Sequence, residues 1–235
     1  MPNSHFPNGI ANVTKNKTMG EMPVLDNSTV IRYFEDFTTH SDILLATPTS
    51  HTVTKVGTGT LAYSSADGAG GVLKLTNSAA DDDSLVVQHK CESFKYVSGK
   101  AWSIKARIKI SDVTQSDLLL GVAITDTTPA DATDYIAFAK TDGSAALTLS
   151  LVKNSTGTFV GSSTLVNDTW VVLGARYVPK TKSVQFLVNE VIVGTTTTLT
   201  NLCDDEELTP TLLFQNGEAV AKSCYIDYID ICFER

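Results

Sequence analysis

Hydrophobic and polar residues alternate along much of the chain after residue 30. In AWSIKARIKI (101–110) the tryptophan, the isoleucines and one alanine share one face, and the serine, lysines and arginine share the other. Because side chains alternate between the faces of a strand, this segment is predicted to be a strand with one face on a core and one in solvent. In SVQFLVNEVIVG (183–194) the pattern predicts two strands joined by a two-residue turn at Asn189 and Glu190.

Short apolar runs bounded by Gly, Asn, Asp and Pro recur as far as residue 233 and predict about sixteen strands. No stretch has a sustained helical period, and only DDEEL (204–208) is compatible with a short helical turn. Sixteen strands are more than an immunoglobulin-type sandwich contains. The strand count therefore favours an all-β jelly roll of two antiparallel sheets over residues 31–235. Its expected core contains Trp102, Ile104, Ile108, Leu119, Phe138, Trp170, Leu173, Phe186, Leu213 and Ile229.

Residues 1–30 have a different pattern of apolar residues and are predicted to form an extended N-terminal arm. The spacing of their apolar residues fits neither a helix nor a strand for more than a few residues, and Pro and Gly interrupt them throughout. Such a segment can bind a neighbouring chain by strand addition, and thirty extended residues would reach about 90 Å. The alternative is that the arm covers an edge of its own sheet. The predicted partner-binding residues are Phe6, Ile10, Val13, Met19, Met22, Val24 and Leu25.

Composition narrows the classes of partner. The chain has 235 residues, 42% of them apolar, so one large domain can build a core. A net charge of −8 and scattered basic residues argue against nucleic acid and against an anionic membrane surface. The first thirty residues have no signal-peptide pattern. The four cysteines lack the spacing of a zinc site, so buried free thiols are expected and no cofactor is predicted.

Catalytic motifs are missing from the sequence, and no enzymatic activity is expected. The nearest carboxylate pair, Asp227 and Asp230, is spaced so that a regular strand would place the two on opposite faces. The four histidines are far apart in sequence. Trp102 and Trp170 are expected in the core, although exposed tryptophans would suit sugar stacking. The acidic turn Asp81–Asp83 is either solvated or a weak candidate for calcium, which prefers carboxylate and carbonyl oxygens.

A series of motifs carries a resemblance to known proteins. FKYVSGKAW (94–102), ARIKISD (106–112), DYIAF (134–138), WVVLGARY (170–177) and the closing CYIDYIDICFER resemble the concanavalin A-like, or laminin G-like, jelly roll. The N-terminal FPNGIANV, MGEMPVLD and YFEDF resemble the front of virion structural proteins from tailed bacteriophages.

This resemblance implies a non-enzymatic decoration or cement protein on the outer surface of a phage head, assembled in the host cytoplasm. Its implied partners are the major capsid protein and neighbouring copies of itself, with a homotrimer as the expected state. The alternative is a virion-associated, lectin-like module that binds a host receptor or a polysaccharide.

Overall fold

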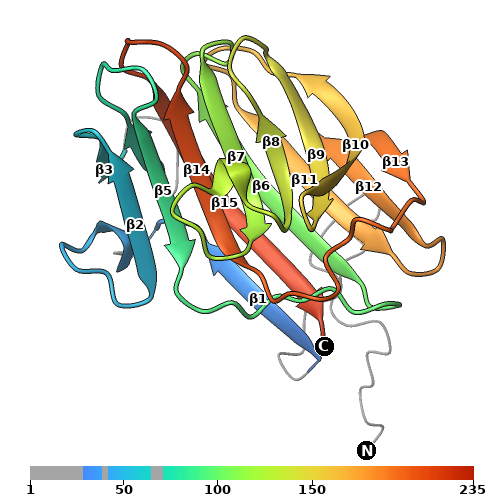
Figure 1. The fold of residues 1–235 in the computed structure, drawn as a ribbon. Coiled ribbons are helices and arrows are strands. Elements are labelled where there is room, and N and C mark those ends of the chain that lie inside the picture. Colours follow the sequence, from blue (N-terminus) through green and yellow to red (C-terminus); the bar gives the residue numbers. More distant parts are fainter. Residues whose placement is uncertain (1–28, 39–41, 65–70) are drawn as a thin grey trace, which may run out of the picture.

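The computed structural model describes residues 29–38, 42–64 and 71–235, which fold into two antiparallel sheets stacked face to face (Figure 1). This arrangement confirms the predicted all-β jelly roll. The described part of the chain contains two short 3-10 turns, η1 (Asp42–Leu44) and η2 (Pro129–Asp131). No helix in it is long and apolar enough to cross a membrane.

The first sheet has eight strands, and seven of them follow one path. In spatial order they are β13 (Val191–Thr196), β12 (Ser183–Val188), β11 (Val171–Val178), β6 (Trp102–Ile110), β15 (Ser223–Glu234), β4 (Leu73–Thr76) and β3 (Thr60–Tyr63). The eighth strand, β1 (Val30–Glu35), pairs with the C-terminal half of β15. The chain therefore enters the domain beside its own last strand, where Arg235 donates a backbone hydrogen bond to Thr29.

The second sheet has seven strands and forms the layer nearer the viewer in Figure 1. In spatial order they are β10 (Thr156–Thr164), β9 (Ala146–Lys153), β8 (Tyr135–Lys140), β7 (Ser116–Ala123), β14 (Thr209–Asn216), β5 (Ser84–His89) and β2 (His51–Val56). One of the short apolar runs counted among the sixteen predicted strands, residues 92–96, does not form a strand, because Phe94 makes only an isolated bridge with Leu208. No helical turn forms at 204–208.

The main core lies between the two sheets and contains most of the predicted residues. Trp102 is 2% exposed and stacks on Phe233 at a ring-centroid distance of 5.8 Å. Trp170 was predicted wrongly, because it is partly exposed on the outer face of the eight-stranded sheet. It stands three residues before the buried Leu173, and residues an odd number apart in a strand point to opposite faces.

Leu119 and Leu213 are buried, but not in the main core. Together with Val86 and Ala137 they form a separate apolar cluster. Their strand neighbours Leu118, Leu120, Leu212 and Phe214 point into the main core, so the cluster lies on the outer face of the seven-stranded sheet. Something must therefore cover this outer face.

A β-bulge changes the phase of β15. Opposite β6, Ile226 pairs with Ile108 and Tyr228 pairs with Arg107, which leaves Asp227 as an extra residue. Ile226, on one side of the bulge, and Ile229, on the other, both point into the core. The phase shift also sets Asp227 and Asp230 on the same outer face, where each meets an arginine.

Candidate functional surfaces

The outer face of the eight-stranded sheet carries alternating basic and aromatic side chains. Lys74 on β4 pairs with Tyr225 on β15, and Tyr225 pairs with Lys109 on β6. Trp170, directly before β11, is the next residue in this cross-strand row. The lysine nitrogens lie over the rings, at 5.3 Å and 4.4 Å from the Tyr225 centroid for Lys74 and Lys109. We call Lys74, Tyr225, Lys109 and Trp170 the cation–aromatic row.

Arg107 extends the row along β6. Its guanidinium carbon lies 4.4 Å from the Trp170 ring centroid, while the Lys109 nitrogen lies 5.3 Å from the same ring. Arg107 also donates to Asp227 at 2.6 Å. All members of the row and Arg107 are partly exposed. The site thus offers two aromatic rings and three cations on a rigid sheet.

The carboxylates of the YIDYID segment are locked in ion pairs. Arg32 donates two parallel hydrogen bonds to Asp230, at 2.8 and 2.9 Å, and Asp227 accepts from Arg107. The expectation that the two carboxylates point to opposite faces is wrong, because the bulge intervenes. The new placement does not create an acid–base pair, since each carboxylate is neutralised by its own guanidinium.

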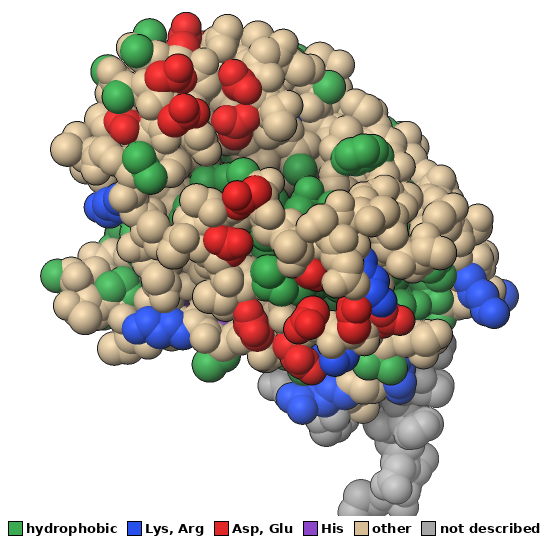
Figure 2. All heavy atoms as spheres, in the orientation of Figure 1, with side chains coloured by type: hydrophobic (Ala, Val, Ile, Leu, Met, Phe, Trp, Pro, Cys, Tyr) green, Lys and Arg blue, Asp and Glu red, His purple; other side chains and the backbone are tan. Residues whose placement is uncertain are grey.

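The outer face of the seven-stranded sheet is hollowed but covered by a loop. Figure 2 shows acidic side chains gathered at opposite ends of this face, with apolar side chains deep in the hollow between them. The segment 124–134, which contains η2, crosses the face and contacts β7 and β14. Gln88 fixes it by donating to Ile124 and Thr211 and accepting from the backbone of Asp126. Segment 124–134 therefore covers part of the hollow on the outer face of the seven-stranded sheet.

The acidic turn Asp81–Asp83 makes separate contacts rather than one site. Asp82 accepts a hydrogen bond from Gln215 at 2.8 Å, and Asp83 is buried and accepts from Ser78. The acidic segment 204–207 likewise binds lysines, with Lys153 at Asp204 and Lys95 at Glu207. Among the described residues, no three His, Cys, Asp or Glu side chains are grouped as metal ligands would be. Calcium at 81–83 stays a prediction.

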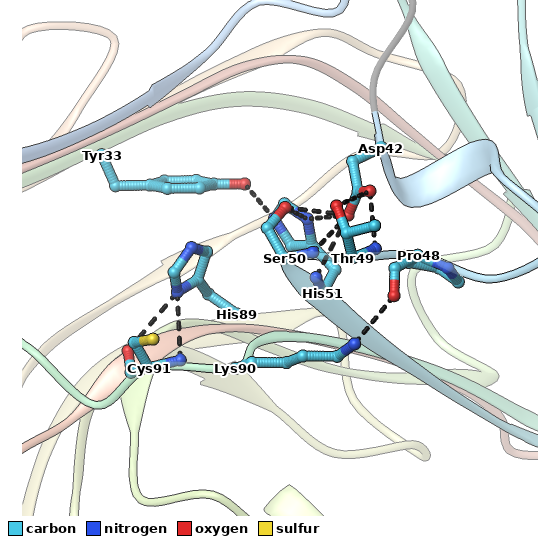
Figure 3. A network of polar contacts seen from close by, with 9 residues as sticks. All are labelled: Tyr33, Asp42, Pro48, Thr49, Ser50, His51, His89, Lys90 and Cys91. Atoms are coloured by element: carbon cyan, nitrogen blue, oxygen red, sulfur yellow. Dashed lines mark hydrogen bonds and ion pairs between the residues drawn. The ribbon is translucent and has the colours of Figure 1, made fainter.

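A partly buried polar network joins residues of β1, η1, β2 and β5 (Figure 3). Asp42 accepts hydrogen bonds from Thr49, Ser50 and His51, including a 3.2 Å contact with the His51 Nδ1. The His51 Nε2 lies 3.2 Å from the Tyr33 hydroxyl. His89 pairs with His51 across β5 and β2, with ring centroids 5.3 Å apart. Only the strand register, which the sequence did not reveal, brings the two histidines together.

The order carboxylate, imidazole and hydroxyl resembles a catalytic relay, but the environment does not suit catalysis. Burial lowers the pKa of His51, partly offset by the hydrogen bond with Asp42, and burial raises the pKa of Tyr33. The adjacent pocket has a volume of about 20 Å³, which is room for one water molecule. The network therefore ties β1, η1 and β2 together.

Two edge strands at one side of the sandwich expose apolar side chains. Phe159 on β10 is 70% exposed and Val191 on β13 is 63% exposed. Ile192 and Val193 follow Val191 and are also exposed, so three consecutive β-branched residues face solvent. β10 and β13 come close together where Gly161 meets Gly194. The predicted arm residues Phe6, Ile10, Val13, Met19, Met22, Val24 and Leu25 lie outside the described residues.

Comparison with solved structures defines the class of fold. A protein of unknown function from Shewanella oneidensis MR-1 is similar, with a TM-score of 0.61 and 16% identity over 88% of this chain and 87% of that one. An endo-1,3-beta-glucanase from Streptomyces sioyaensis gives 0.58 and 12% identity over 90% and 99%. The Emp47p carbohydrate recognition domain gives 0.59 and 11% identity over 89% and 99%.

The chain thus has a concanavalin A-like, lectin-type jelly-roll fold. These similarities concern the fold alone, since the same fold includes a glucanase and a carbohydrate recognition domain. No protein-family model matches the chain, and no curated protein matches it.

Proposed function

We propose that this chain is a non-catalytic structural protein of a tailed-phage virion that binds the outer surface of the head and reinforces it. The observation that carries the proposal is the run of exposed apolar residues Val191–Val193 on edge strand β13. An exposed, apolar edge strand is a liability for a soluble protein and is suited to a permanent contact with another protein. The resemblance of the N-terminal segments to virion structural proteins supports the same function.

In this proposal the arm ties neighbouring subunits together. The domain begins at β1, whose first residue Val30 pairs with Glu234 beside the C-terminus. The arm therefore starts from a fixed point at one end of the sandwich. The proposed partners are the major capsid protein and other copies of this chain, and the proposed oligomer is a homotrimer, because closed symmetry lets each arm reach the next subunit without forming a filament.

The absence of catalysis is part of the proposal. Asp227 and Asp230 are each paired with an arginine, and the His51 side chain is buried. The thiol of Cys203 is buried, and burial raises its pKa to about 12, so it is a poor nucleophile at neutral pH.

The test is binding to heads that lack the protein, measured by cosedimentation. Two variants are compared with the wild type: a deletion of residues 2–28, and a triple variant Val191→Thr, Ile192→Thr and Val193→Thr, which keeps the strand propensity. Each buried large apolar side chain contributes about 1.5–3 kcal/mol, against about 8 kcal/mol for a micromolar complex. Each variant is therefore expected to bind at least about tenfold more weakly.

The matched control is Val97→Thr with Val220→Thr, since both valines are about as exposed but lie in loops away from β13. It is expected to bind like the wild type. Full occupancy of heads by both the deletion and the triple variant would refute the proposal. Loss of stability on deletion, without loss of binding, would instead show that the arm covers its own sheet.

A second candidate function is lectin-like binding of a host receptor or polysaccharide. The cation–aromatic row favours it, because partly exposed aromatic rings can stack on sugars. A glycan array with a clear hit, together with no association with heads, would reverse the order of the two functions.

A further inference from the structure

We infer that the cation–aromatic row, with Arg107 beside it, is a binding site for an acidic polysaccharide whose sugar units carry carboxylates. This inference gives the second candidate function a site and a ligand class, and it rests on that function rather than on attachment to heads.

The geometry of the row suits a chain of sugar rings. Lys74, Tyr225 and Lys109 are direct neighbours on three adjacent strands, and Trp170 continues the row at a fourth. Adjacent strands lie about 4.8 Å apart, so the row is about 14 Å long, which is the length of a short oligosaccharide. Aromatic rings and cations alternate along it, so one ligand can contact rings and form ion pairs in turn.

The rings are held in place by the sheet itself. Arg107 and Lys109 stand two residues apart on the same face of β6, and both lie against the Trp170 ring. Lys109 also lies over Tyr225, so it links the two rings. A site built on strands needs little ordering when a ligand binds, which reduces the entropic cost of association.

Charge decides between an acidic polysaccharide and a nucleic acid. Arg107 is paired with Asp227, so the positive charge that the row offers comes mainly from Lys74 and Lys109. A nucleic acid presents a dense line of phosphates and needs many clustered cations. A polyuronate carries at most one carboxylate on each ring, which suits a row whose two lysines stand on either side of Tyr225.

The test is a titration of the full chain with polygalacturonate, followed by tryptophan fluorescence. The chain has two tryptophans, and Trp102 is buried in the core, so a saturable change reports on Trp170. The change should weaken as salt is added, because the contacts are exposed ion pairs. Neutral dextran of similar length should produce no change.

The double variant Lys74→Gln and Lys109→Gln should bind polygalacturonate about tenfold more weakly or worse, as expected for the loss of charge-assisted contacts. The matched control is Lys95→Gln with Lys100→Gln, which removes two lysines from exposed ion pairs outside the row. Equal thermal unfolding of both double variants would show that folding is intact.

Three outcomes would overturn the inference: no response to polygalacturonate, an equal response to dextran, or unchanged affinity in the row variant. Tighter binding of single-stranded oligothymidylate than of polygalacturonate would also overturn it and would point to nucleic acid. A glycan-array hit that is insensitive to the row variant would keep the lectin-like function but place its site elsewhere.

Discussion

The loop over the outer face of the seven-stranded sheet depends on Gln88, and replacing this residue with alanine should release it. Gln88 is 4% exposed, and its amide makes three hydrogen bonds: to the Ile124 oxygen at 3.1 Å, to the Thr211 hydroxyl at 2.9 Å and from the Asp126 nitrogen at 3.1 Å. A buried hydrogen bond contributes about 0.5–1.5 kcal/mol net. The free energy of unfolding should therefore fall by about 2–4 kcal/mol.

Urea unfolding gives this difference directly, and the melting temperature should fall by roughly 4–16 °C for a domain of this size. Hydrogen exchange adds a local readout, because the amides of 125–134 should exchange faster while those of β6 do not. The matched control is Gln215→Ala, which removes one partly exposed hydrogen bond to Asp82 and should change stability little. A loss below about 1 kcal/mol, or unchanged exchange at 125–134, would refute the assigned role of Gln88.

Two further predictions concern the histidine network and the edge strands. Burial lowers the pKa of His51, so just below the ordinary histidine pKa the folded state binds fewer protons than the unfolded state. The free energy of unfolding should therefore be highest above about pH 6.5 and fall as the pH is lowered. Urea midpoints that stay constant from pH 7.5 to 5.5 would contradict this prediction. Gly194→Ala would place a Cβ against the backbone carbonyl of Val160 and should cost about 1–3 kcal/mol. In the control Gly157→Ala the nearest atom is a side-chain carbon at 3.5 Å, and equal thermal stability of the two variants would contradict the expected overlap.

The sequence predicted the architecture because the strands with one buried face alternate cleanly. The alternation in β6 and the Asn189-Glu190 turn are as predicted, since both depend on local pattern and turn chemistry. The exposed position of Trp170 was also available from the sequence, because the odd spacing from Leu173 puts the two on opposite faces. Residue type favours the core for a tryptophan, but the phase of the strand places Trp170 on the outer face.

Other features depend on contacts between distant segments and could not be predicted in this way. The extra residue Asp227 is visible only when β15 is set against β6. The meeting of His51 with His89 likewise requires the register of β2 and β5. By contrast, an unbroken apolar run such as LLLGVAI (118–124) is typical of a strand that is covered on both faces, and the residues of this run in β7 are all buried. What it could not identify was the cover, which is the chain's own segment 124–134.

The distribution of surfaces over the sandwich makes the two proposed contacts compatible in one molecule. The cation–aromatic row lies on the outer face of the eight-stranded sheet and ends at β11, whereas the apolar run Val191–Val193 lies on the edge strand β13, with β12 between them. Two strand spacings separate them by about 10 Å. A partner seated against the edge would therefore leave Lys74, Tyr225 and Lys109 in solvent. The hollow of the other sheet lies on the opposite face of the sandwich, so a copy attached through β13 would keep the proposed ligand-binding row accessible.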